Sequence, residues 1–272
     1  MINPLKSIEI NSYRLWHPKI AKAQQGIQIA QISDVHLGRW VKPRHMEQVV
    51  DFVNQRRPDL VALTGDYVGY SSKDLYPSTA TLGGLTSPSF AVLGNHDHWT
   101  STEAALEGFA AAEIPVLTNE SRVVETERGI LRLVGVDDHV TNKADVDAAF
   151  RDVEESINEE LFCLVLNHVP SLAPRIAERG ADLILSGHTH GYQFNIPGFT
   201  NRLAQRLGAQ YHVGAYFLDG TYLYINRGLG SASWPWRIGA APELTFFELA
   251  HGPRPRLELL ETSSFGVNHR PR

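Results

Sequence analysis

Sulfur is scarce in this chain: its 272 residues include one cysteine and two methionines. A single cysteine, Cys163, excludes an internal disulfide. Cys163 lies in an apolar segment with no neighbour that would lower its pKa, so we expect a buried core residue rather than a catalytic thiol. The chain is therefore compatible with a reducing compartment.

Long apolar runs and a basic excess are also missing. No stretch approaches the roughly 20 residues that span a bilayer, and Met1–Lys6 lacks the pattern of a secretory signal. The formal charge of −5 argues against a nucleic-acid partner and against broad binding to anionic membranes. We expect a cytoplasmic protein, with peripheral contact at the inner membrane as an open alternative.

The pattern of predicted elements changes after His190. Before it, apolar strands alternate with helices predicted at 43–57, 101–112, 145–157 and 171–179 and with a hairpin over 122–136, and an edge strand is expected at 5–14. After it, strands are predicted at 192–196, 212–218, 221–226, 244–249 and 257–260. We predict one domain over 1–272 with a flexible tail at 263–272. The expected class is α/β (α+β), a four-layer αββα sandwich of two mixed sheets flanked by helices.

Five apolar runs each end at residues that can bind metals. The runs at 27–33, 59–64, 90–93, 161–166 and 182–186 are followed by Asp34-Val35-His36, Gly65-Asp66, Gly94-Asn95-His96-Asp97, Asn167-His168 and Gly187-His188-Thr189-His190. Short apolar runs with such boundaries predict buried strands. Side chains just beyond the carboxyl ends of neighbouring strands converge on one crevice. We therefore expect these groups to meet and to bind metal, with two ions favoured by their number.

Each motif also has an ordinary structural explanation. An isolated Asp-x-His is more often a solvated loop, Gly65-Asp66 is a common turn, and a histidine at a strand end such as His168 is usually structural. Gly187–Gly191 is the most specific motif, because two alternating histidines between glycines can reach two neighbouring ions. Independent coincidences at all five strand ends would be required to explain the whole set without a metal.

In their order and intervals the five motifs resemble the calcineurin-like metallophosphoesterases. The later segments Asn226–Gly230 and Ala241–Leu244 resemble a bacterial branch of small phosphodiesterases, the YaeI and YkuE type. The resemblance implies one metal held by Asp34, His36, Asp66 and His190. It implies a second held by Asp66, Asn95, His168 and His188, with Asp66 bridging. It further implies catalytic roles for His96, at the phosphoryl or leaving-group oxygen, and for Asp97 behind the ligands.

Two departures from the family pattern concern the site. Many relatives carry a further Asp where this chain has Gly69, which leaves open what orients His96. The branch often has Gly where this chain has Tyr192, so Tyr192 is expected to reshape the pocket. His98 has no assigned role.

The predicted ligands suit phosphoester hydrolysis. Two divalent ions outweigh the charges of Asp34 and Asp66, so the centre attracts an anionic ester. Two such ions can supply a metal-activated hydroxide and clamp the attacking and leaving oxygens. A nitrogen and oxygen ligand set favours Mn²⁺, Fe or Zn²⁺ over Ca²⁺ and Mg²⁺.

The substrate is open at this stage. Trp234 follows the 228–230 loop and is either core packing or an apolar wall. Arg227 and Arg237 either bind a second phosphate or are ordinary surface arginines. Tyr192, Trp234 and Arg227 form the predicted substrate-binding set. The branch resemblance points to a small or lipid-linked phosphodiester or pyrophosphate of the UDP-2,3-diacylglucosamine type. The alternatives are a phosphomonoesterase or protein phosphatase of the same fold, and a non-catalytic binding scaffold.

Overall fold

The computed structural model describes residues 6–151, 160–193, 196, 200, 206, 210–231, 234 and 236–267. Two six-stranded sheets form the centre of this part of the chain, in the orders β12-β1-β11-β2-β3-β4 and β5-β6-β7-β8-β10-β9. The strands of the first sheet are β1 Ile8–His17, β2 Ile27–Ile32, β3 Leu60–Thr64, β4 Ser89–Val92, β11 Glu243–His251 and β12 Arg256–Phe265. Those of the second are β5 Glu120–Thr126, β6 Gly129–Val136, β7 Cys163–Asn167, β8 Leu183–Ser186, β9 Gly214–Leu218 and β10 Thr221–Ile225.

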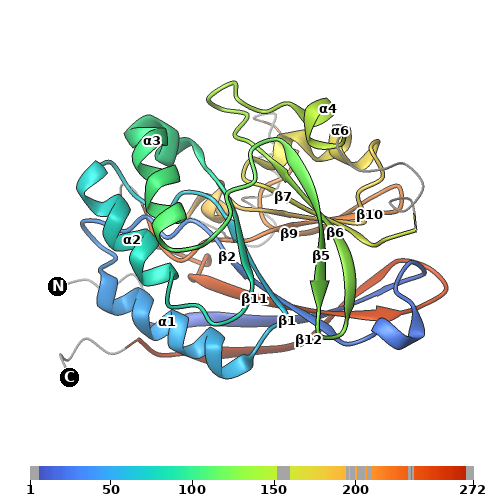
Figure 1. Cartoon of the computed structure of the whole chain (residues 1–272). Coiled ribbons are helices and arrows are strands. Elements are labelled where there is room, and N and C mark those ends of the chain that lie inside the picture. The colour runs from blue at the N-terminus through green and yellow to red at the C-terminus, as the bar shows by residue number, and fades with distance from the viewer. Residues whose placement is uncertain are drawn as a thin grey trace.

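Helices cover the outer face of each sheet (Figure 1). The α-helices are α1 Pro43–Arg56, α2 Leu75–Leu82, α3 Asn95–Ala111, α4 Val146–Ala149 and α6 Ala173–Ala177. Short 3₁₀ turns are η1 Lys22–Gln24, η2 Ser72–Asp74, η3 Pro170–Leu172 and η4 His190–Tyr192. Helices α1 to α3 pack on the first sheet, whereas α4 and α6 pack on the second.

Alternation along β2 shows why the layers form. Ile27 and Ile29 point between the two sheets, whereas Ala30 and Ile32 point toward α1 to α3. The second sheet repeats the arrangement, since Leu164 faces the first sheet and neighbouring apolar side chains face α4 and α6. The predicted αββα sandwich of two mixed sheets is confirmed.

Parallel pairing positions the site. Strands β2, β3 and β4 pair in parallel, as do β6, β7, β8 and β10. Their carboxyl ends therefore lie along one edge of the sandwich, where the sequence motifs follow.

Several predicted boundaries were wrong. Strand β1 is not at an edge, because β12 pairs antiparallel outside it and runs on to Phe265, opposite Ile8. Residues 263–265 of the predicted flexible tail are thus part of the sheet, and 268–272 lie outside the described residues. Helix α2 was not predicted.

The helix predicted from Ser101 begins at Asn95. Asp97, in its first turn, accepts a hydrogen bond from the Gly94 amide at 2.9 Å, which starts the helix early. The backbone leaves helical geometry at Ser101 (φ −174°, ψ 107°), and the Ser101 hydroxyl accepts from the Ala104 amide. Ser101 therefore caps only the second segment of α3.

Two further predictions fall partly on undescribed residues. The helix predicted at 145–157 is described only as Val146–Ala149, and 152–159 lie outside the described residues. Instead of a strand from Tyr192, the chain forms η4 and then places Gln193 in the left-handed region (φ 56°). Residues 194 and 195 lie outside the described part.

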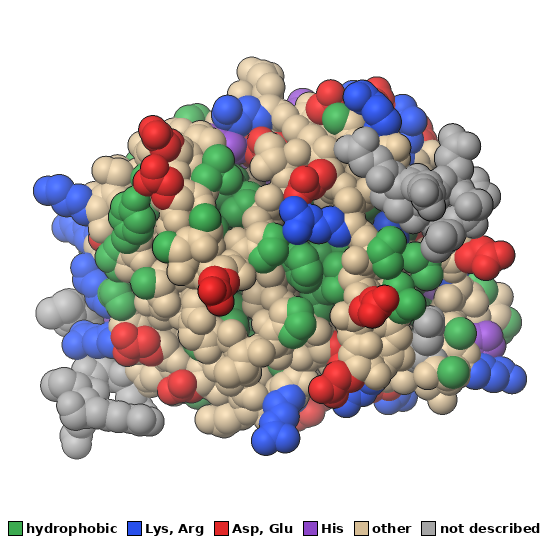
Figure 2. Space-filling model, in the orientation of Figure 1, with side chains coloured by type: hydrophobic (Ala, Val, Ile, Leu, Met, Phe, Trp, Pro, Cys, Tyr) green, Lys and Arg blue, Asp and Glu red, His purple; other side chains and the backbone are tan. Residues whose placement is uncertain are grey.

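Basic and acidic side chains are interspersed on the face shown in Figure 2, with hydrophobic side chains between them. This face has no large area of one charge. Among the described residues, no helix is both long enough and apolar enough to cross a membrane.

Candidate metal centre

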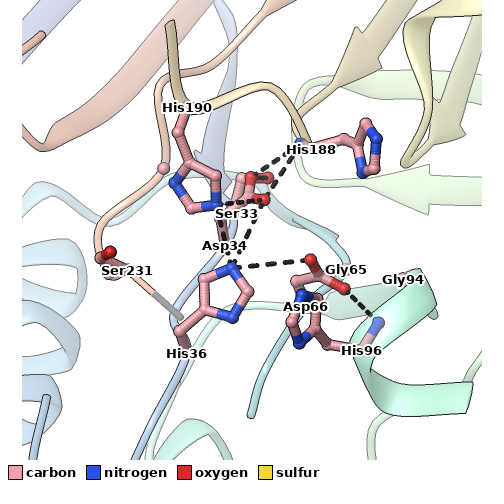
Figure 3. Close-up of polar contacts among 12 residues, drawn as sticks. Ser33, Asp34, His36, Gly65, Asp66, Gly94, His96, His188, His190 and Ser231 are labelled. Carbon is pink, nitrogen blue, oxygen red and sulfur yellow. Dashed lines mark hydrogen bonds and ion pairs between the residues drawn. The ribbon is translucent and has the colours of Figure 1, made fainter. Parts of the chain in front are cut away.

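The side chains that follow β2, β3, β7 and β8, together with the start of α3 after β4, meet at one edge of the sandwich (Figure 3). Three overlapping groups have ligand atoms within 4.8 Å of one another: Asp34, His36 and His190; His36, Asp66 and His96; and Asp66, His168 and His188. Asp66 belongs to two of these groups. Its carboxylate therefore lies between two sets of potential ligand atoms.

The first predicted metal site is compact. His36 Nε2 lies 2.9 Å from His190 Nε2 and 3.5 Å from Asp66 Oδ2. His190 Nε2 also lies 3.4 Å from Asp34 Oδ1. All four predicted ligands of this site thus point at one small volume.

The second predicted site shares Asp66 Oδ2 with the first. His168 Nε2 is 3.3 Å from Asp66 Oδ2 and 3.3 Å from His188 Nδ1. His188 Nδ1 is 2.8 Å from the Asn95 Oδ1 atom. The amide oxygen of Asn95 therefore lies beside one of the two imidazoles that approach each other near Asp66.

Backbone carbonyls fix two of the histidines. His36 Nδ1 donates to the Val68 carbonyl at 3.1 Å, and His168 Nδ1 donates to the Thr64 carbonyl at 2.7 Å. With the proton held on Nδ1, a neutral ring directs the lone pair of Nε2 into the centre. The donor set therefore fits divalent metal ions with mixed nitrogen and oxygen ligands.

Burial sets the protonation of most ligands. It lowers the pKa of His36 and of His188 to about 4 each and that of His190 well below its usual range, which keeps these rings neutral. For His168 burial alone would lower the pKa, but the Asp66 carboxylate raises it to about 10. A metal ion at the second site therefore has to displace a proton from His168.

The backbone at the ligands is unusual. Five predicted ligands have positive φ angles: Asp34 (48°), His36 (45°), Asp66 (58°), His188 (71°) and His190 (53°). Such conformations cost roughly 1–3 kcal/mol each and concentrate at functional sites. The fold thus holds strained backbone at the residues selected from the motifs.

Glycines make room for the carboxylates. A Cβ at Gly94 would lie 2.2 Å from Asp66 Oδ1, and one at Gly187 would lie 2.2 Å from Asp34 Oδ2. A Cβ at Gly228 would lie 2.4 Å from the Asp34 Cβ. These three positions require glycine for steric reasons.

Asp97 holds the backbone around Asp66 through hydrogen bonds. Its fully buried carboxylate accepts hydrogen bonds from the amides of Asp66, Tyr67 and Gly94 at 2.8–2.9 Å. Asp97 does not reach the groups that face the predicted ions. Its expected role behind the ligands is thus supported by its contacts.

The backbone of Gly69 orients the ring of His96. His96 Nδ1 donates to the carbonyl of Gly69 at 2.6 Å, and the His96 amide donates to Asp66 Oδ1 at 2.9 Å. The backbone of residue 69 thus does what the aspartate of other family members was expected to do.

The calcineurin-like phosphoesterase family model matches residues 27–192, more than half of the chain and all five motifs. The chain belongs to the calcineurin-like phosphoesterase family. It is 28% identical over 250 residues to the metallophosphoesterase YkuE of Bacillus subtilis, covering 89% of this chain and 85% of that protein. It is 30% identical over 228 residues to the phosphodiesterase YaeI of Escherichia coli, covering 82% of each. The predicted family and branch are confirmed, and the chain is a hydrolase.

A solved structure shares the fold of this phosphoesterase. The Plasmodium protein GAP50, titled as the anchor in the inner membrane complex, superposes with a TM-score of 0.54. It is 14% identical, and the match covers 90% of each chain.

The predicted substrate residues of the phosphoesterase have different surroundings. Arg227 is engaged in the core, where its Nε donates to the buried Glu243 at 2.7 Å and its Nη2 donates to Glu9. Tyr192 and Trp234 instead line a pocket of about 550 Å³, together with Thr189, His190, Gln193 and Trp236. Tyr192 also lines a second pocket of about 480 Å³ beside His188. Tyr192 therefore lines two pockets, each of which also contains a predicted metal ligand.

Three further residues lie at the site of this phosphoesterase, and of these Asp137 and Asp138 were not predicted. Arg237 donates to His190 Nδ1 at 3.0 Å and to the carbonyl groups of Arg227 and Gly230, so it ties the 226–230 loop to a ligand. Asp137 and Asp138 follow β6 at the same edge, and Asp137 lies 2.7 Å from His98 Nε2. Position after a strand was a signal for the aspartates, whereas Arg237 was expected to bind a phosphate or to lie on the surface, and its contact with His190 was not predicted.

Proposed function

We propose that this protein is a dinuclear metal-dependent hydrolase that cleaves phosphodiester or pyrophosphate bonds. The observation that carries the proposal is the sharing of Asp66 between two groups of ligand atoms, one with His36 and one with His168 and His188. Asp66 Oδ2 lies 3.5 Å from His36 Nε2 and 3.3 Å from His168 Nε2, and a carboxylate oxygen can serve two cations at once because it has two lone pairs. The proposed ligands of one ion are Asp34, His36, Asp66 and His190, and those of the other are Asp66, Asn95, His168 and His188.

Two bound divalent ions, Mn²⁺, Fe or Zn²⁺, would polarise the phosphoryl oxygens and make water a better nucleophile near neutral pH. The chain contributes two carboxylate charges at Asp34 and Asp66, and its other predicted ligands are neutral side chains. Four positive charges against two leave the centre attractive to an anionic ester.

His96 is proposed to contact the phosphoryl group on the leaving-group side. One of its ring nitrogens lies within 4.8 Å of ligand atoms of His36 and Asp66, and Gly69 fixes the ring. With Nδ1–H donated to the Gly69 carbonyl, a hydrogen bond from Nε2 to an oxygen that gains charge during the reaction requires the second ring proton.

An apolar substituent is proposed for the other side of the ester. The pocket at His190 is lined by Tyr192, Trp234 and Trp236, and a lipid-linked pyrophosphate of the UDP-2,3-diacylglucosamine type would place acyl carbon there. Peripheral contact with a membrane and a cytoplasmic location are compatible with such a substrate. Arg227 has no part in the proposal, because Glu243 and Glu9 occupy its guanidinium.

The test compares hydrolysis of bis-p-nitrophenyl phosphate and p-nitrophenyl phosphate by Mn²⁺-loaded protein. The proposal expects the diester to have the higher kcat/KM and both Asp66→Asn and His188→Ala to lower it by about 100-fold or more. His139→Ala, which changes an exposed histidine outside the centre, is the matched control. A preference for the monoester would favour a phosphatase, and full activity of either ligand variant would contradict the dinuclear assignment.

A further inference from the structure

Two exposed aromatic rings flank His96. The Tyr70 ring centroid lies 4.9 Å from that of His96 with 64° between the planes, and the Trp99 centroid lies 5.2 Å away with 60° between the planes. A third ring, His36, meets His96 at 4.8 Å from the side of the metal centre. His96 therefore separates the predicted ligands from an aromatic surface formed by Tyr70 and Trp99.

Both rings are open to solvent even though they contact a half-buried histidine. Tyr70 is 67% exposed and Trp99 is 60% exposed. Single exposed aromatic residues are common on protein surfaces. Two of them on the same imidazole, beside a predicted metal centre, place aromatic rings next to anything bound at His96.

The surface is held in place from the site itself. Tyr70 follows Gly69, whose carbonyl accepts from His96 Nδ1 and whose amide donates to the Leu37 carbonyl at 3.2 Å. Trp99 lies in the first segment of α3, before the break at Ser101, and Asp97 anchors that segment. The backbone of Tyr70 and Trp99 is therefore fixed relative to His96 and Asp66.

We propose that Tyr70 and Trp99 form the subsite for the leaving group, and that this group carries a planar ring, as in an aryl or nucleoside ester. The inference rests on the function proposed above, which puts His96 on the leaving-group side. Neither ring carries a positive charge to attract an additional phosphate, whereas both stack on or meet the edge of another ring favourably. The pocket at Trp234 and Trp236 remains for the second substituent.

The experiment compares two diesters on Mn²⁺-loaded protein. In methyl p-nitrophenyl phosphate the only good leaving group is a ring, and in bis(2,2,2-trifluoroethyl) phosphate the leaving group has none. The double variant Tyr70→Leu/Trp99→Leu keeps apolar side chains but removes both rings. Trp234→Leu/Trp236→Leu, the control pair, makes the same kind of change in the pocket at His190. Tyr70→Phe keeps the ring.

The expected result is a fall of about tenfold in kcat/KM for the aryl diester in Tyr70→Leu/Trp99→Leu, with a change of no more than about twofold for the trifluoroethyl diester. Metal content should stay at the wild-type value. Tyr70→Phe should keep the wild-type ratio of kcat/KM for the aryl diester to kcat/KM for the trifluoroethyl diester. Trp234→Leu/Trp236→Leu should change kcat/KM for the two diesters by the same factor, so that their ratio stays at the wild-type value.

Equal losses on both diesters would overturn the inference, because the rings would then only support His96. No loss on either diester would overturn it as well. Failure of the proposed function has a different signature: the metal-loaded wild-type protein would hydrolyse neither diester, and the leaving-group assignment would fall with it.

Discussion

Replacing Gly94 by alanine should disable the metal centre while leaving the protein folded. The backbone at Gly94 (φ −104°, ψ 175°) is open to any residue, so only the added methyl matters. That methyl would lie 2.2 Å from Asp66 Oδ1 and 2.6 Å from the Asp66 amide nitrogen, where contacts below 3.0 Å are essentially never seen. The Asp66 carboxylate must retreat by about one ångström, whereas metal–ligand distances tolerate about 0.2 Å.

Because Asp66 is shared by both predicted sites, both should lose affinity. We expect Gly94→Ala to lower metal content and to reduce kcat/KM for bis-p-nitrophenyl phosphate by about 100-fold or more. Overpacking of this kind costs about 1–3 kcal/mol, less than the about 5–15 kcal/mol stability of a typical domain. Metal analysis, steady-state kinetics and thermal unfolding measure the three effects.

Gly69→Ala is the matched control, because a Cβ there would have no neighbour within 4 Å. It changes another glycine at the same centre and should keep metal, activity and stability. Retention of two metals and full activity by Gly94→Ala would refute the reasoning, since Asp66 could then not be the fixed shared ligand.

Three other predictions follow from buried groups. Asp97→Asn should destabilise the protein by about 1–3 kcal/mol in urea unfolding, because the new amide would face a backbone N–H donor; an unchanged midpoint would contradict this. For Glu243, burial alone would raise the pKa, but Arg227 and its other partners lower it from 4.5. Its contribution to stability is therefore present above pH 4.5 and lost as pH falls through the folded value, and Glu243→Gln should flatten that part of the stability profile. Burial raises the pKa of Cys163 to about 12, so the folded protein should not react with a thiol reagent at pH 8, and rapid labelling would argue against the core position.

The position of the ligands could be predicted because it depends on strand ends alone. An apolar run followed by Asp34 or His188 indicates a buried strand and the edge at which it ends, and parallel pairing brings such edges together. The layered core was predicted from the order of strands and helices along the chain. These features are local in the sequence, and one chain is enough to read them.

Long-range and backbone features were out of reach. The length of β12 depends on its pairing with β1, some 250 residues away in the chain, and the polar residues 263–265 carry little strand signal. The carbonyl of Gly69 orients His96, yet a backbone group leaves no trace in a motif. Arg227 was a plausible phosphate ligand until the structure paired it with Glu243.

The most direct test of the account is the metal content of the purified protein, measured together with hydrolysis of bis-p-nitrophenyl phosphate before and after chelation and return of Mn²⁺. The account predicts close to two metal ions per chain, activity that disappears with chelation, and activity that returns with Mn²⁺. One ion or none, with no hydrolysis after reconstitution, would contradict the dinuclear centre and favour a binding scaffold with the phosphoesterase fold.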